Sequence, residues 1–289
     1  MSNSRFVAVI LAAVLAGMLG AYLLPAAHHS ASTSATESTY DRVMRTQTIR
    51  CGYAVWPPLL IKDANSGQLS GMEYDYLQAL GEALHLKIDW AEEVGWGDFP
   101  VALNAGRIDA FCAGAWPNSS RARQIDFTTP ILYQPLYAYV RADDHRFDNN
   151  LAAINSPSVT TVTMDGEMSS LVTAADFPQA KTVQLPQLSS PPELLLNVTS
   201  GKGDVTFTDS YTAAEYAANN PGKIRRVTSP PLRAFGVPLA IAHGQYEFAR
   251  MADIATEELL ASGKIEKIIT KYEREPGMFL RAAPPYLQQ

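Results

Sequence analysis

The chain has 289 residues, of which 47% are hydrophobic and 18% charged, and its formal net charge is −6. This composition excludes a disordered protein and provides enough residues for two α/β lobes of ordinary size. The acidic balance excludes a global positive field for nucleic acid or an anionic membrane, so a bound anion requires a local positive site.

The N-terminus begins with an apolar segment of the kind that directs export. Arg5 precedes an unbroken apolar run of 19 residues, 6–24, and a tract rich in serine, threonine and alanine follows it. The run is longer than the core of a usual signal peptide and just long enough to span a bilayer. We therefore predict a periplasmic or otherwise extracytoplasmic protein, with residues 1–25 a cleaved signal peptide or retained membrane anchor and 26–46 a flexible linker. A buried core helix is the alternative for the apolar run.

The chain contains two cysteines, Cys51 and Cys112, and both fall in apolar, strand-like stretches. Two cysteines make neither a disulfide framework nor a metal site. We favour two unpaired residues that pack as small hydrophobic side chains over a single disulfide.

Beyond the linker, short apolar strands alternate with amphipathic helices. In the first half, strands are predicted at 48–53, 86–91 and 108–113, helices at 74–84 and 99–105, and a polar hairpin at 62–70. Helical spacing of leucines supports the first helix, and Gly106 is a normal stop for the second. This alternation predicts a parallel sheet with crossover helices.

A second α/β series follows a β-rich run and a polar, turn-rich stretch. Its elements are strands at 159–164, 182–185, 204–208 and 235–242, and helices at 169–175, 193–199, 213–218, 246–261 and 264–273. Because strands and helices alternate in the same way in each half, we predict two lobes, with the chain crossing between them near residues 141 and 233. The predicted division is 47–141 with 233–289 for lobe 1, and 142–232 for lobe 2.

The sequence shows no catalytic constellation. It has no nucleophile elbow, zinc-protease motif, Walker loop or dinucleotide-binding glycine motif. The histidines are scattered, and His85 and His243 are predicted to be surface residues. We expect no enzymatic activity, no metal and no cofactor.

The segment 114–123, which reads Gly-Ala-Trp-Pro-Asn-Ser-Ser-Arg-Ala-Arg, directly follows a predicted strand. Ligands in α/β proteins bind at the carboxyl ends of parallel strands. Arg121 there offers a planar, permanently charged fork for a carboxylate or phosphate. The alternative is a solvated basic helix start that pairs with Asp126.

Six short motifs occur along the chain in the order that is typical of one protein family. They are Gly71-Met-Glu-Tyr-Asp75, Arg107-Ile-Asp109-Ala, the Gly114 turn with Arg121, Ile125-Asp126-Phe127-Thr-Thr-Pro130, Gly203-Asp204-Val and Ser262-Gly263-Lys-Ile. Over most of residues 48–273 the chain resembles extracellular solute-binding protein family 3, the periplasmic receptors of polar amino acid ABC transporters. The resemblance implies a periplasmic-binding-protein type II-like fold, with two α/β lobes, a two-stranded hinge and a ligand in the cleft. It also implies a monomer that closes on an amino acid-like solute and delivers it to a membrane permease.

The resemblance assigns roles to individual residues. Arg121 matches the arginine that pairs with the ligand's α-carboxylate, and Gly114 and the backbone N–H of Trp116 match the turn that binds the same group. Asp209 matches the carboxylate that holds the ligand's ammonium group. Trp56 and Trp96 match an aromatic cover and a pocket wall; packing inside a lobe is the alternative for both.

Two departures from the family pattern concern the ligand. Trp116 replaces a usual polar residue, and Glu167 stands where the family has threonine or serine after a glycine. A glutamate there repels a ligand carboxylate unless it faces solvent or meets a cationic group. An aromatic cleft with extra acid suits a ring-bearing or cation-bearing ligand.

Two other functions fit the same resemblance. A cyclohexadienyl or arogenate dehydratase-like enzyme would use a pocket acid to expel a hydroxyl, and Glu167 is the candidate acid. A membrane-tethered solute sensor would need a separate signalling chain, since no kinase or cyclase follows residue 273.

Overall fold

The computed structural model describes residues 37–282. The predicted signal or anchor segment, 6–24, lies outside this range. No helix within the described range is long and apolar enough to cross a membrane.

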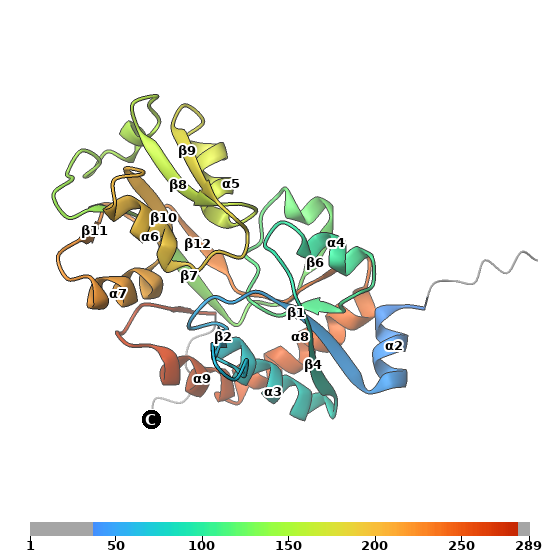
Figure 1. Ribbon diagram of the computed structural model, residues 1–289. Coiled ribbons are helices and arrows are strands. Elements are labelled where there is room, and N and C mark those ends of the chain that lie inside the picture. The colour runs from blue at the N-terminus through green and yellow to red at the C-terminus, as the bar shows by residue number, and fades with distance from the viewer. Residues whose placement is uncertain (1–36, 283–289) are drawn as a thin grey trace, which may run out of the picture. The chain divides into compact units, whose positions relative to one another are not determined.

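The first sheet has five strands in the order β4–β1–β5–β13–β6 (Figure 1). Their bounds are β1 Thr48–Tyr53, β4 Lys87–Glu93, β5 Ala110–Phe111, β6 Ile125–Phe127 and β13 Ala240–Ala242. Strand β1 is parallel to β4 and β5, as the alternation of strands and helices predicts, whereas β13 is antiparallel to β5 and β6. This sheet defines lobe 1, and a two-stranded hairpin of β2 (Ile61–Lys62) and β3 (Leu69–Ser70) projects from it at the predicted place.

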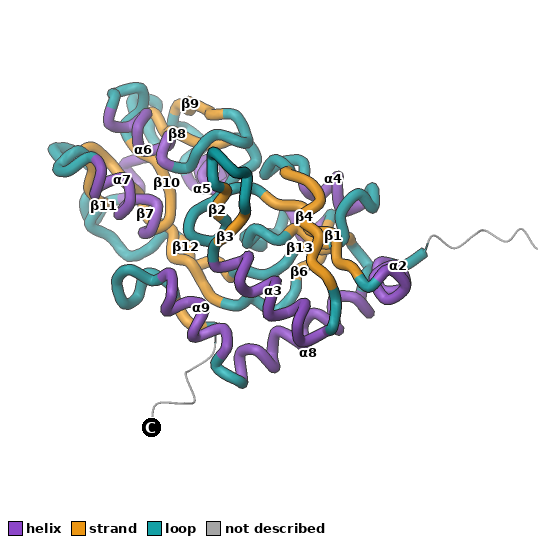
Figure 2. Tube along the Cα trace, turned by 60° about the horizontal axis from the view of Figure 1, so that its bottom comes forward, coloured by secondary structure: helices purple, strands orange, loops and turns teal. Residues whose placement is uncertain are grey.

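Helices of lobe 1 pack on the sheet and on one another through their apolar faces. They are α3 Met72–Leu84, α4 Phe99–Asn104, α8 Tyr246–Ala261 and α9 Lys264–Tyr272. Helix α3 buries Met72, Tyr76, Leu77 and Leu80, which recur at helical spacing, and it ends at His85 in the left-handed conformation. Figure 2 shows α3 beside α8 and α9, and the Tyr76 hydroxyl bonds Thr256 of α8 at 2.6 Å.

The second sheet runs in the order β11–β7–β10–β8–β9 and defines lobe 2. Its strands are β7 Leu132–Arg141, β8 Thr160–Met164, β9 Lys181–Leu185, β10 Val205–Asp209 and β11 Ile224–Arg226. Its helices are α5 Met168–Asp176, α6 Pro192–Thr199 and α7 Ser210–Asn219. Two 3-10 turns are also present: η1 Arg121–Arg123 precedes β6 of the first sheet, and η2 Leu151–Ile154 precedes β8.

Two antiparallel strands connect the lobes. The first half of β7 pairs with β12 (Arg233–Gly236), and the same part of β7 also pairs with β14 (Leu280–Arg281). The predicted strand 235–242 is therefore wrong as a single element. It divides into β12, which belongs to the hinge, and β13, which belongs to the first sheet, with Pro238 between them.

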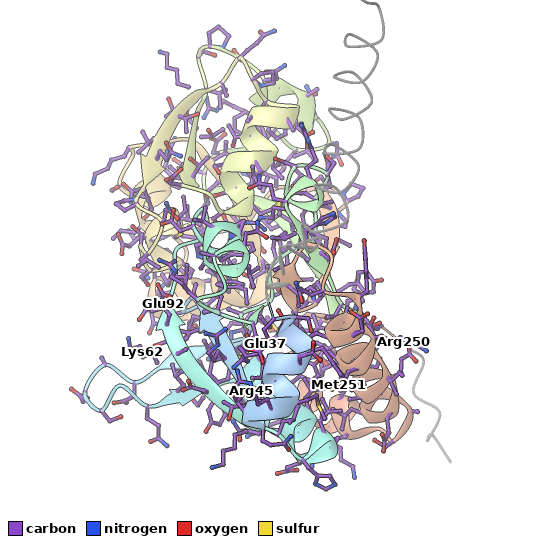
Figure 3. The ribbon with its side chains drawn as sticks, turned by 90° about the vertical axis from the view of Figure 1, so that its right-hand side faces the viewer. Glu37, Arg45, Lys62, Glu92, Arg250 and Met251 are labelled. Atoms are coloured by element: carbon purple, nitrogen blue, oxygen red, sulfur yellow. A yellow bond between two sulfur atoms is a disulfide. The ribbon has the colours of Figure 1, made fainter. Side chains whose placement is uncertain are left out.

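The last part of the expected linker is helical. Helix α2 (Thr39–Thr46) begins at Ser38, whose hydroxyl accepts a hydrogen bond from the Asp41 N–H, and it buries Val43. Figure 3 shows α2, which carries Arg45, beside α8, which carries Arg250 and Met251. The Arg42 guanidinium also pairs with the buried carboxylate of Asp109, so this helix is part of lobe 1.

Cys51 and Cys112 form a disulfide, so the preference for unpaired cysteines is wrong. Cys51 lies on β1 and Cys112 follows the neighbouring strand β5, which brings their Cα atoms to 5.6 Å. The bond requires the adjacency of β1 and β5, which residue patterns alone do not reveal. A buried disulfide is typical of proteins that fold in an oxidising compartment.

Removing this disulfide is expected to lower the free energy of unfolding by about 2–4 kcal/mol, because the bond closes a long loop and so restricts the unfolded chain. Urea denaturation of the wild type with and without reductant measures the loss. The double variant Cys51→Ala/Cys112→Ala is the control, because reductant should leave it unchanged. Equal stability of the oxidised and reduced wild type contradicts the prediction.

Candidate functional site

A small cavity of about 20 Å³, room for about one water molecule, lies between the lobes, next to the hinge. Lobe 1 contributes Trp56, Leu59, Trp96, Gly114, Trp116 and Arg121 to its wall, the hinge strand β7 contributes Gln134, and lobe 2 contributes Glu167 and Met168. Six of the seven residues predicted from the sequence therefore meet around one cavity. The seventh, Asp209, is one hydrogen bond away, behind Trp56.

Arg121 is a buried cation whose hydrogen bonds all go to neutral groups. Its side chain is held by the carbonyl oxygens of Trp116 (Nη1, 2.9 Å), Gly166 (Nη2, 2.8 Å) and Trp96 (Nη2, 3.4 Å). Burial lowers the pKa of its guanidinium to about 10, and the charge of Glu167 opposes that shift, so Arg121 remains a cation at neutral pH. A buried cation without a bonded carboxylate is suited to an anionic group of a ligand.

The alternative of a solvated arginine paired with Asp126 is wrong. Arg121 is 7% exposed, and the Asp126 carboxylate instead accepts hydrogen bonds from the backbone N–H of Gly244 and pairs with His243. The 3-10 turn that begins at Arg121 is fixed by Asn118, whose Oδ1 accepts from the Arg121 N–H at 2.9 Å.

The turn at Gly114 requires glycine. Its φ of +68° is in the left-handed region, and an added Cβ would lie 2.8 Å from Val237 Cγ1 and 3.0 Å from Leu59 Cδ1. Within the described residues, the N–H groups of Gly114, Ala115 and Trp116 donate no hydrogen bond. These backbone donors beside Arg121 form a second source of hydrogen bonds for an anion.

Trp56 and Asp209 connect the two lobes. The Trp56 Nε1–H donates to Asp209 Oδ2 at 2.8 Å, and the Trp56 ring meets Trp96 edge-on at 5.6 Å. Asp209 also caps helix α7, since its carboxylate accepts from the N–H and the hydroxyl of Thr212, both at 2.9 Å. In this arrangement the Asp209 carboxylate faces Trp56, and its role toward a ligand ammonium stays a prediction.

Glu167 is buried and serves as the cap of helix α5. Its Oε2 accepts from the Ser169 N–H at 2.7 Å and from the Ser169 hydroxyl at 2.6 Å. Burial raises the pKa of its carboxyl, while the Ser169 hydrogen bonds and the Arg121 charge oppose the shift. Glu167 therefore does not face solvent, and it places an acid in the cavity opposite Arg121.

Gly166 makes a close approach to lobe 1. Its φ is +70°, and an added Cβ would lie 2.4 Å from the backbone nitrogen of Gly97. Beside it, the Gly97 N–H donates to Gln187 Oε1 of lobe 2 at 2.7 Å, and the Gly166 carbonyl accepts from Arg121. The close contact of the lobes thus depends on two residues without side chains.

Four residues of the cavity wall are missed by the sequence prediction: Leu59, Ala113, Gln134 and Met168. Leu59 and Met168 carry no signal beyond being apolar residues near predicted strand ends. Gln134 is a fully buried amide on the hinge strand, and only its position in an otherwise apolar β-rich run could have drawn attention to it.

Glu73, in the first turn of α3, lies beneath the Gly114 turn. It is fully buried, and neither carboxyl oxygen has a hydrogen-bond partner among the described residues. An added Cβ on Gly114 would lie 3.4 Å from its Oε1. Burial raises the pKa of Glu73 well above its ordinary value, which favours the neutral acid in the folded protein.

Because the folded state holds the Glu73 proton to higher pH than the unfolded state, stability should fall as pH rises above about 4.5 toward the raised pKa, by up to about 1.4 kcal/mol per pH unit. The substitution Glu73→Gln should remove this contribution. Urea denaturation between pH 4.5 and 8 measures the difference in slope between wild type and variant. Glu82→Gln, an exposed position on the same helix, should keep the wild-type slope. Identical slopes for wild type and Glu73→Gln contradict the prediction.

Comparisons with known proteins bear on the fold and the family of the chain. The sequence model of the bacterial extracellular solute-binding proteins, family 3, matches residues 49–275. A probable histidine-binding protein of Neisseria gonorrhoeae is 26% identical over 220 residues, which cover 74% of this chain and 78% of that protein. The type II periplasmic-binding-protein fold predicted from the sequence is thereby confirmed by the family match and by the similarity to solved structures of amino acid-binding proteins.

Two further similarities concern an enzyme on the same fold. A cyclohexadienyl dehydratase of Pseudomonas aeruginosa is 24% identical over 185 residues, which cover 64% of this chain and 67% of that enzyme. The crystal structure of an ancestral amino acid-binding protein, described as a precursor of cyclohexadienyl dehydratase, is 25% identical. It superposes with a TM-score of 0.71 and covers 82% of this chain and 99% of its own.

Proposed function

We propose that this chain, which belongs to the bacterial extracellular solute-binding proteins, family 3, captures an amino acid or a related small polar solute for an ABC importer. The observation that carries the proposal is Arg121, a cation buried in the cleft whose hydrogen-bonded partners are all neutral carbonyls. A ligand carboxylate can pair directly with this cation, which bonds no carboxylate among the described residues. The backbone N–H groups of Gly114 and Trp116 complete the anion site.

Capture proceeds by closure of the lobes. The ligand first docks on lobe 1 at Arg121, and lobe 2 then closes through the Gly166 carbonyl and the Trp56–Asp209 hydrogen bond. Asp209 accepts hydrogen bonds from the ligand ammonium group. It does so with the carboxylate lone pairs that are not occupied by the hydrogen bonds from Trp56 and Thr212. Because both lobes contact the ligand only when closed, the closed form reports occupancy to the permease.

The protein acts outside the cytoplasm as a monomer, delivered there by its N-terminal apolar segment. The family is extracellular, and the buried Cys51–Cys112 disulfide suits an oxidising compartment. Mass spectrometry of the protein isolated from its native host determines the mature N-terminus and so tests whether residues 1–25 direct export. A mature N-terminus near residue 26 indicates cleavage, an intact one in the membrane fraction indicates an anchor, and an intact one in the cytosol contradicts export.

A thermal-shift screen tests the function. A ligand at 100 times its Kd adds about 2.7 kcal/mol to the stability of the native state, which raises the melting temperature of a protein of this size by about 5 °C or more. We expect at least one L-amino acid to do so among amino acids, polyamines, betaines and aromatic acids. A screen in which only amines without a carboxylate stabilise the protein contradicts the role of Arg121.

Glu167 favours a second candidate function, that of a cyclohexadienyl dehydratase-like enzyme. A buried carboxyl with a raised pKa, opposite an anion-binding arginine, has the properties of a general acid. Incubation with prephenate and with arogenate tests the candidate. Turnover that Glu167→Gln abolishes supports it, and no turnover of either compound removes it.

A further inference from the structure

The side-chain amide of Gln134 has a fixed orientation in the cavity wall. Gln134 is fully buried on β7, and the indole Nε1–H of Trp116 lies 3.2 Å from its Oε1. An indole nitrogen can only donate, so the carboxamide oxygen must face Trp116. The Nε2 group faces away from Trp116, and it is buried without a hydrogen-bond partner among the described residues.

Both hinge strands hold this orientation. Phe235 of β12 stands directly opposite Gln134 in the β7–β12 ladder and stacks on the Trp116 ring, with ring centres 5.0 Å apart. Rotation of the amide would therefore break the Trp116 hydrogen bond inside a packed aromatic cluster. A buried, unpaired N–H group destabilises a protein unless a ligand or water pairs with it.

The Nε2 donor of Gln134 and the guanidinium of Arg121 are placed to bind different parts of a ligand. Arg121 bonds the backbone carbonyl of Trp116, whereas Gln134 bonds the far, indole end of the same residue. A ligand carboxylate at Arg121 thus leaves the Gln134 donor for an acceptor elsewhere in the molecule. Gln134 is itself neutral and its amide oxygen bonds the Trp116 indole, so a second ligand charge beside it would gain no opposite charge from this residue.

We propose that Gln134 is a specificity-determining residue, and that it selects amino acids whose side chain ends in a neutral carbonyl, such as a carboxamide. The inference rests on the proposed function, since it presupposes an amino acid in the cleft. A side chain that ends in an ammonium group offers only donors and leaves Gln134 unpaired. A side chain without polar atoms leaves it unpaired as well.

Isothermal titration calorimetry with four probes tests the proposal: L-glutamine, L-asparagine, L-norleucine and L-lysine. The wild type should bind the better of the two carboxamides at least about tenfold more tightly than norleucine, the usual effect of leaving a buried polar group unpaired. Gln134→Met, similar in size but without a donor, should reduce this ratio to about one. Gln134→Glu keeps the acceptor for Trp116 and replaces the donor by a carboxylate, so it should shift the preference toward L-lysine.

The wild-type affinities alone test the proposal even where a variant fails to fold, which circular dichroism shows. If the wild type binds norleucine or lysine as tightly as both carboxamides, or if folded variants keep the wild-type ratios, Gln134 does not determine specificity and the proposed function stands. If no amino acid stabilises the wild type in the thermal-shift screen, both the proposed function and this inference are wrong.

Discussion

Replacing Arg121 with alanine is expected to abolish the rise in melting temperature that an amino acid ligand produces. The substitution removes the single buried cation of the cavity wall and leaves the ligand carboxylate with backbone donors only. Truncating one partner of a buried, hydrogen-bonded charge pair costs about 2–5 kcal/mol, so the affinity should fall by about 30-fold or more. Calorimetric titration of wild type and variant with the best ligand of the screen measures the change.

Arg123→Ala is the matched control for that experiment. Arg123 ends the same 3-10 turn but is exposed, so its removal changes the net charge by the same amount without touching the cavity. Its affinity should stay within about twofold of the wild type, since exposed charges contribute little. A ligand that binds Arg121→Ala as tightly as it binds Arg123→Ala contradicts the role of Arg121 as the anchor.

Replacing Gly166 with alanine is expected to weaken ligand binding by preventing the lobes from meeting. The new Cβ would lie 2.4 Å from the Gly97 nitrogen and 2.6 Å from its Cα, and both are backbone atoms that cannot move aside singly. Overpacking of this kind costs about 1–3 kcal/mol, which corresponds to a roughly 5- to 150-fold loss of affinity when only the closed form is affected.

Gly201→Ala separates closure from backbone strain. Gly201 also lies in lobe 2 with φ +77°, but an added Cβ there meets no atom within 4 Å. Both variants should lose similar stability from the left-handed conformation, and only Gly166→Ala should lose affinity. Denaturation and titration of the two proteins give both quantities. Equal affinities of Gly166→Ala and Gly201→Ala would show that ligand binding does not require the contact at Gly166.

Local patterns in the sequence predict most of the fold. The alternation of strands and helices yields both sheets, and the leucines at helical spacing yield α3, because these elements bury one apolar face each. The prediction of a single strand at 235–242 is wrong because β12 and β13 have similar residue preferences, although the two strands belong to different sheets. Only the path of the chain across the hinge distinguishes them.

Some residues of the candidate site can be predicted from the sequence and others cannot. Arg121 and Gly114 are predictable because they follow a strand whose carboxyl end lies at a ligand-binding edge. The Cys51–Cys112 disulfide is not predictable from patterns, since it depends on which strands are neighbours. Gln134 is not predictable either, because its importance comes from one hydrogen bond to Trp116 that fixes the direction of its free donor.

The most direct test of this account compares the best-binding amino acid with its methyl ester in a calorimetric titration. The ester keeps the side chain and the ammonium group but removes the negative charge that Arg121 is positioned to bind. We expect the ester to bind at least about 30-fold more weakly than the free acid. Equal affinities for the ester and the acid would contradict a cleft that closes on a carboxylate held by Arg121.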